Sequence, residues 1–101
     1  MIEITQDEFD SAIKVANALV MFSGAGCPNC KMQELQIEQL AKEVDESVKF
    51  LKLSVAESQD LVTRFDVMTL PTLLIVKDGE VVEVLPRLTP KAVLKSKLST
   101  L

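Results

Sequence analysis

The feature that most constrains the fold is a pair of cysteines, Cys27 and Cys30, placed between two different patterns of hydrophobicity. Before the pair, Ala18–Phe22 is a continuous apolar run of strand length, typical of a β-strand that is covered on both faces. After the pair, apolar residues recur at helical spacing from about Met32 onwards. The sequence therefore predicts a buried strand, a tight loop and a helix, with both cysteines at the start of that helix.

The start of a helix is a special environment for a thiol. The first N–H groups have no partner within the helix, and the macrodipole places partial positive charge there. A thiol held at this end loses its proton more readily, and the thiolate is the reactive form. Pro28 fits the same position, because proline is well tolerated in the first helical turn. Cys27 is therefore the predicted nucleophile, and Cys30, one turn later, is close enough to attack a disulfide formed on Cys27.

Length, composition and charge limit the class of protein. The 101 residues predict a single domain, residues 1–101, and an apolar fraction of 48% is enough to fill a core. A net charge of −4 without a concentrated basic face argues against a nucleic-acid partner. The apolar runs are far shorter than a membrane span, and Met1–Ile4 lacks the pattern of an export signal. We therefore expect a cytoplasmic protein that does not bind membranes.

The cysteine pair is expected to work without a metal or another cofactor. Zinc prefers four ligands, whereas this chain offers two sulfurs and no histidine. A dimer that holds zinc or an iron–sulfur cluster between two motifs is the less favoured alternative. A purely structural disulfide is disfavoured too, since closing so small a loop removes little entropy from the unfolded chain. We therefore expect the redox-active centre to be the Cys27–Cys30 pair itself.

The rest of the chain predicts elements in the order βαβαβαββα. The predicted strands are residues 2–4, 18–22, 48–55, 72–76 and 81–84. Asp78-Gly79, between the last two strands, is a strong hairpin signal. Helical crossovers make the earlier strands parallel, whereas a hairpin is antiparallel. The predicted fold class is therefore α/β, with a central mixed five-stranded sheet and helices on both faces.

Four amphipathic helices are predicted, each with a start signal. These signals are a Thr5/Glu8 capping box, the cysteine motif, a Ser58 cap, and a Thr89 cap followed by Pro90. The first helix is expected to end at Asn17, and the second to run from Cys27 to Val44. The buried face of the first helix is predicted to contain Phe9, Ala12, Ile13 and Ala16. For the second helix it is predicted to contain Ile37, Leu40, Ala41 and Val44. For the last helix it is predicted to contain Val93, Leu94 and Leu98.

With these elements placed, the chain resembles the thioredoxin family over essentially its whole length. Gly26-Cys27-Pro28-Asn29-Cys30-Lys31 is similar to the family's Trp-Cys-Gly-Pro-Cys-Lys, and Leu70-Pro71-Thr72 is similar to its Ile-Pro-Thr. In that family the proline is cis and lies beside the cysteines. Glutaredoxins also use Cys-Pro-x-Cys, but they normally lack the first strand and helix predicted here and carry a Gly-Gly pair that this chain does not have.

The resemblance implies a thioredoxin fold and a thiol–disulfide oxidoreductase that reduces disulfide-containing proteins through Cys27 and Cys30. The implied substrate-binding groove consists of Gly26, Pro28, Asn29, Leu70 and Pro71. The implied electron donor is a thioredoxin reductase or a dedicated flavin-dependent reductase, and we expect a monomer. An alternative from another class is a redox-inert module that holds a partner in the groove around Pro71.

The chain departs from the family at positions that tune the chemistry. Met21 stands where the family has a buried aspartate, and Lys52 aligns with the lysine that pairs with that aspartate. We expect Lys52 to extend to solvent, because a buried unpaired ammonium is costly. Lys31 is a nearby cation that would favour a thiolate. Ser23 and Gly26 replace two tryptophans that the family has near the motif. Thr69 and Arg87 replace glycines that line the family's partner-binding surface.

Overall fold

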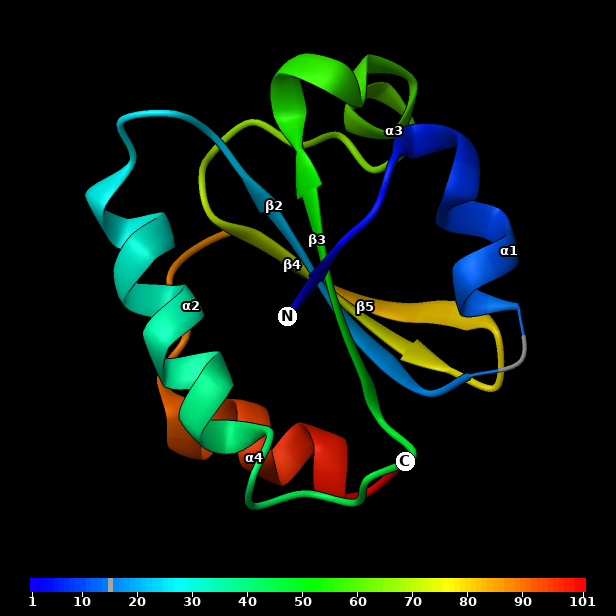
Figure 1. The fold of residues 1–101 in the computed structure, drawn as a ribbon, viewed down its shortest axis with the longest axis vertical. Coiled ribbons are helices and arrows are strands. Elements are labelled where there is room, and N and C mark those ends of the chain that lie inside the picture. Colours follow the sequence, from blue (N-terminus) through cyan, green and yellow to red (C-terminus); the bar gives the residue numbers. More distant parts are fainter. Residues whose placement is uncertain (15) are drawn as a thin grey trace.

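A computed structural model describes residues 1–14 and 16–101, and it has the predicted order of strands and helices (Figure 1). The strands are β1 (Ile2–Glu3), β2 (Ala18–Ser23), β3 (Lys49–Ser54), β4 (Thr72–Lys77) and β5 (Glu80–Leu85). The helices are α1 (Phe9–Ile13), α2 (Pro28–Leu40), α3 (Gln59–Arg64) and α4 (Lys91–Ser99). Short 3₁₀ turns, Gln6–Glu8 and Val55–Glu57, precede α1 and α3.

The strands form one five-stranded sheet in the order β1-β3-β2-β4-β5. β1, β3 and β2 are parallel to one another, whereas β4 is antiparallel to β2 and β5 is antiparallel to β4. The predicted mixed α/β fold is therefore confirmed. Because Phe22 near the end of β2 pairs with Thr72 at the start of β4, the loops that follow β2 and precede β4 meet at one end of the sheet.

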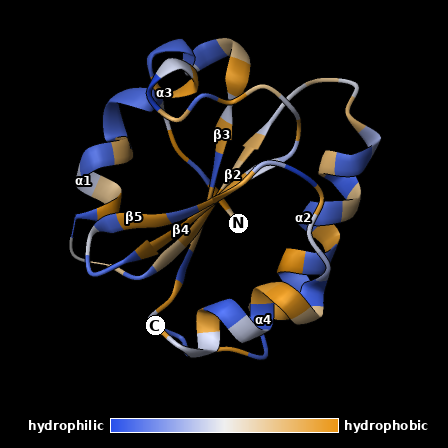
Figure 2. Ribbon diagram, turned by 180° about the vertical axis from the view of Figure 1, so that it is seen from behind, coloured by the Kyte–Doolittle hydropathy of each residue, from blue (hydrophilic) through white to orange (hydrophobic). Residues whose placement is uncertain are grey.

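Two separate apolar cores lie on the two faces of the sheet, and β2 contributes to both. Ala18, Val20 and Phe22 face the core under α1 and α3, whereas Leu19 and Met21 face the core under α2 and α4. All five side chains are buried, as a strand covered on both faces requires. Figure 2 shows hydrophobic residues along the central strands, and helices in which hydrophobic and hydrophilic residues alternate.

The first predicted helix is shorter than expected. Its capping box is present, because the Glu8 carboxylate accepts hydrogen bonds from the Thr5 N–H and hydroxyl, which lower the pKa of Glu8. However, α1 ends at Ile13, and residue 15 of the predicted helix lies outside the described residues. The Asn17 side chain instead accepts a hydrogen bond from the Asp78 N–H, so this segment is used to hold the hairpin turn.

The second predicted helix also ends early, at Leu40 rather than Val44. The following turn has i to i−3 hydrogen bonds, which span one residue fewer than those of an α-helix. Ala41 is exposed rather than buried as predicted. This turn places Glu43 against α4, where its carboxylate pairs with Lys91 at 2.6 Å and Lys95 at 3.1 Å. Hydrogen bonds from these two ammonium groups lower the pKa of Glu43. The helix end is therefore set by contacts with α4.

Of two predicted helix caps, one is right in position only and the other is wrong. Ser58 occupies the N-cap position of α3, but its side chain makes no capping hydrogen bond. The N-cap of α4 is Pro90 rather than Thr89, because the extended backbone at Pro90 directly precedes the first helical residue. Val93 is 41% exposed instead of buried, while Leu94 and Leu98 pack into the core as predicted.

The predicted Asp78-Gly79 hairpin is confirmed. Both residues have positive φ, 51° and 84°, as the tight two-residue turn between antiparallel strands requires. The Gly79 N–H donates to the Ala16 carbonyl at 3.1 Å, which brings the turn against the chain that follows α1. A side chain at Gly79 would collide with the backbone carbonyl of Lys14. Only glycine satisfies both the turn and this contact.

Replacing Gly79 with alanine should therefore destabilise the protein more than replacing Gly26, although both have positive φ. The left-handed backbone costs about 1–2 kcal/mol in either variant. Only at Gly79 does the added methyl group also meet backbone atoms, whereas the space around Gly26 is open. We expect Gly79→Ala to lose at least about 1 kcal/mol more than Gly26→Ala. Urea unfolding of the oxidised proteins measures this difference, and equal losses would contradict the proposed contact.

Candidate active site

The cysteines lie where the central strand β2 passes into α2. Cys27 is the N-cap residue of α2, with extended backbone, and Pro28 is the first helical residue. This is the arrangement that the sequence predicts. The motif itself satisfies one of the free backbone donors at the helix N-terminus, because the Cys27 Sγ accepts a hydrogen bond from the Cys30 N–H at 3.1 Å. The helix start therefore places a backbone donor directly against the first sulfur.

The two cysteines form a disulfide, with their Cα atoms 5.3 Å apart. The two residues differ in accessibility, because Cys30 is only 2% exposed whereas Cys27 is half-buried. An incoming disulfide can therefore reach Cys27 more easily than Cys30. This geometry is consistent with the predicted order, in which Cys27 attacks first and Cys30 acts second.

The loop that contains the cis Leu70-Pro71 bond meets the cysteine loop at the same end of the sheet. The contact is close, since a Cβ atom added to Gly24 would lie 2.8 Å from the Leu70 Cδ1. Beside this contact is a small groove of about 130 Å³. It is lined by Val55, Gln59, Val62, Val67, Met68, Thr69 and Leu70.

The fold thus brings the predicted groove residues to one end of the molecule, from segments about 40 positions apart. Gly26, Pro28 and Asn29 are exposed around the cysteines, Leu70 is half-buried and Pro71 is buried. Lys31, directly after Cys30, is exposed. The roles assigned to these residues remain predictions, while the location of both segments at the same end of the sheet follows from the β2–β4 pairing.

The prediction that Lys52 extends to solvent is wrong. Its ammonium group is bonded to both carboxylate oxygens of Glu34, at 3.1 and 3.2 Å, and its side chain is 26% exposed. Lys52 is the register partner of Met21, and both lie on the sheet face covered by α2. Met21 is fully buried there. The negative charge that pairs with Lys52 therefore comes from Glu34 on α2, and not from the β2 position that Met21 occupies.

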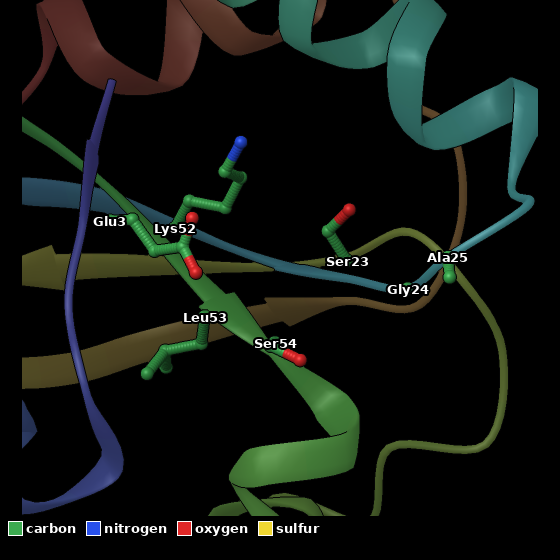
Figure 3. A pocket seen from close by; sticks show the side chains of 7 residues that line it. All are labelled: Glu3, Ser23, Gly24, Ala25, Lys52, Leu53 and Ser54. Atoms are coloured by element: carbon green, nitrogen blue, oxygen red, sulfur yellow. The ribbon is translucent and has the colours of Figure 1, made fainter.

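A polar cavity of about 180 Å³ lies at the ends of β2 and β3, beside the loop that leads to the cysteines (Figure 3). It is lined by Glu3, Ser23, Gly24, Ala25, Lys52, Leu53 and Ser54. Lys52 and Ser23 extend toward the α2 side of the sheet, whereas Leu53 extends toward the opposite side (Figure 3). The cavity is large enough for several water molecules. It therefore leaves room for water beside Lys52.

Sequence reasoning missed Gln33, which is fully buried on α2 three residues after Cys30. Its side-chain amide donates to the Thr89 carbonyl at 3.0 Å and accepts from the Thr89 N–H at 2.7 Å. Cys30, Gln33, Ile37 and Leu40 form the buried stripe of α2. This helical spacing was visible in the sequence, but a polar side chain does not by itself indicate burial.

The described residues contain no group of three or more histidine, cysteine, aspartate or glutamate side chains placed to hold a metal ion. None of their helices is long and apolar enough to cross a membrane.

Comparison with known sequences points to one family. The family model described as Thioredoxin matches residues 1–100. A curated thioredoxin from Staphylococcus epidermidis is 36% identical over 91 residues, which cover 90% of this chain and 88% of that protein. A thioredoxin from Bacillus subtilis is 34% identical over 95 residues, covering 94% of this chain and 91% of the relative.

Solved structures give the same result. A mutant thioredoxin from Halobacterium salinarum superposes with a TM-score of 0.87 at 29% identity, covering 98% of this chain and 88% of the other. The oxidised form of mitochondrial thioredoxin 3 from Saccharomyces cerevisiae superposes with a TM-score of 0.88 at 25% identity, covering 100% of this chain and 95% of the other.

In the reduced protein, we expect the pKa of the Cys27 thiol to lie below that of a free cysteine. The Cys30 N–H and the α2 N-terminus both stabilise the thiolate. A Met21→Asp substitution should raise this pKa, because a carboxylate beneath α2 would oppose the charge on sulfur.

Thiolate absorbance during a pH titration of the Cys30→Ser variant measures the Cys27 pKa, with the same variant unfolded in urea as the free-thiol reference. A folded-state pKa equal to or above that reference would contradict the helix-start argument. An unchanged or lower pKa after adding Met21→Asp would contradict the charge argument.

Proposed function

The chain belongs to the thioredoxin family, and we propose that it reduces protein disulfides in the cytoplasm. It is a thiol–disulfide oxidoreductase. The observation that carries the proposal is the Cys27–Cys30 disulfide at the start of α2, with one accessible and one buried sulfur.

In the proposed reaction, the Cys27 thiolate attacks one sulfur of a substrate disulfide. A bond forms between the Cys27 Sγ and that sulfur, and the other substrate sulfur leaves as a thiolate and takes up a proton. Cys30 then loses its proton and attacks the Cys27 Sγ, which releases the second substrate thiol. Two electrons have passed to the substrate, and the Cys27–Cys30 disulfide remains on the protein.

The proposed substrate-binding groove is formed by Gly26, Pro28, Asn29, Leu70 and Pro71. Its support is their common location around the disulfide. An extended substrate segment would lie along the backbone that precedes β4, where main-chain groups supply hydrogen bonds. Such a groove presents the substrate disulfide to the accessible sulfur of Cys27.

Thioredoxins act on disulfide substrates and are reduced by thioredoxin reductase. For this chain, we propose a thioredoxin reductase or a dedicated flavin-dependent reductase as the donor that restores the dithiol. The protein is proposed to act as a monomer, with the cysteine pair as its whole redox centre and no other cofactor.

Three nearby residues are proposed to tune the thiols. Lys31 is an exposed cation beside Cys30 and favours negative charge on sulfur. The charge of Lys52 is largely balanced by Glu34, so its effect on the thiols is smaller. Met21 contributes no charge beneath the helix, which leaves the Cys27 thiolate unopposed from that side.

The order of attack can be tested with two matched serine variants. Incubated with a disulfide-containing protein, Cys30→Ser should accumulate a mixed disulfide, because the second attack is lost. Cys27→Ser should accumulate at least about tenfold less, because its remaining sulfur is buried. Non-reducing electrophoresis and intact mass measure the adducts. Equal adducts on both variants would contradict the assigned order, and reductant-insensitive binding by both would favour the redox-inert module.

The direction of the reaction can be tested by the reduction potential of the Cys27–Cys30 pair. We expect a value of about −270 mV, similar to the potential of thioredoxin. Equilibration in defined dithiol/disulfide buffers, followed by trapping of free thiols, gives this value. A potential of about −120 to −200 mV would instead indicate an oxidant, an isomerase or a glutathione-linked carrier.

A further inference from the structure

We propose that Arg87 selects substrates that have an acidic side chain next to their disulfide, and that the buried Gln33 holds Arg87 in place. Arg87 lies in the loop of residues 86–90, between β5 and α4. The inference rests on the proposed function, because it concerns which disulfides the Cys27 site reduces.

Gln33 fastens this loop to the helix that contains the cysteines. Its amide makes two hydrogen bonds to the main chain of Thr89, and both residues are buried. Burying an amide is favourable only when both its donor and its acceptor are satisfied, as they are here. Since Gln33 follows Cys30 by one helical turn, the loop is fixed relative to the disulfide.

The other end of the loop is fastened to the segment that contains Pro71. Leu85 pairs with Leu73 in β4, and the Thr69 hydroxyl donates a hydrogen bond to the Pro86 carbonyl. The Thr72 hydroxyl in turn donates to the Thr69 carbonyl at 2.6 Å. The loop of residues 86–90 is therefore anchored on the Pro71 side and on the α2 side, and Arg87 lies between the two anchors.

The charge around the site is positive. The three segments that meet there, residues 26–31, 67–71 and 86–90, contain two cations, Lys31 and Arg87, and no carboxylate. Both cations are exposed, and neither forms an ion pair within the described part of the chain. The carboxylate nearest to these segments in the sequence is that of Asp66, directly before the second segment. The carboxylate of Glu34 on α2 is paired with Lys52. This contrasts with a net charge of −4 for the whole protein.

A cation on an anchored loop suits selection between substrates. Charges at the rim of a binding site mainly change the rate of productive encounter, and they reject partners of like charge. Anchoring the backbone reduces the entropy lost when Arg87 meets a carboxylate. The substrate class that fits is a protein disulfide flanked by aspartate or glutamate.

Two disulfide peptides test the proposal, identical except for aspartate or lysine next to the attacked cysteine. The measured quantity is the ratio of their second-order reduction rate constants. The wild-type protein should prefer the aspartate peptide by about two- to fivefold, the range for an exposed ion pair. Arg87→Ala should bring the ratio close to one, and Arg87→Glu should reverse it. Added salt should also lower the wild-type ratio.

Lys77→Ala is the matched control, because Lys77 is an exposed cation at the hairpin end of β4, away from the cysteines. It should keep the wild-type ratio, and a loss there would overturn the assignment to Arg87. If the wild-type protein reduces both peptides at equal rates, the selection by Arg87 is refuted while the reductase function stands. If it reduces neither peptide, the proposed function itself fails.

The role of Gln33 is tested with Gln33→Leu, which leaves the main chain of Thr89 without its partners. The peptide ratio should fall although Arg87 is unchanged, while the Cys27–Cys30 reduction potential stays at its wild-type value. If Gln33 has only a structural role, the variant should have a lower melting temperature and an unchanged peptide ratio. That result would refute the proposal that Gln33 positions Arg87. If Gln33→Leu does not fold, Gln33→Met provides the same test with a side chain of similar length.

Discussion

The antiparallel pairing of β4 with β2 is the interaction on which the site depends. β2 delivers the chain to the cysteines, and β4 begins directly after Pro71. The Phe22–Thr72 register places both ends side by side, and burial of β2 on both faces holds that register, since a one-residue shift would exchange its two sets of side chains. The loops that contain the cysteines and Pro71 are therefore positioned by the most buried part of the fold.

The structural features that could be predicted from the sequence are those with local causes. The Asp78-Gly79 turn, the Thr5/Glu8 capping box and the helix start at Pro28 each depend on neighbouring residues, and each is present. The cis bond at Pro71 was expected only from the family resemblance, because no local rule distinguishes it from an ordinary strand-start proline. Sequence patterns thus located the disulfide and the sheet, and the resemblance located the loop beside them.

The features that were missed are contacts between distant segments. Lys52 meets Glu34 across 18 positions, and Gln33 meets Thr89 across 56 positions. The partners in each contact belong to segments far apart in the sequence, so the periodicity within one segment identifies neither contact. The early end of α1 has the same kind of cause, since Asn17 bonds to the hairpin turn. Polar contacts of this type follow from the packed fold rather than from a local pattern.

The same contacts decide how charge is arranged around the thiols. In the reduced protein we expect the helix start to stabilise a thiolate on the accessible Cys27, whereas Cys30 is buried. A single negative charge at an accessible sulfur would repel an approaching acidic segment. Lys31 and Arg87, which lack ion-pair partners among the described residues, offset that repulsion at the rim. On this proposal, a reactive thiolate on Cys27 and an acidic substrate are compatible, because Lys31 follows Cys30 on α2 and Arg87 lies on the loop that Gln33 fastens to α2.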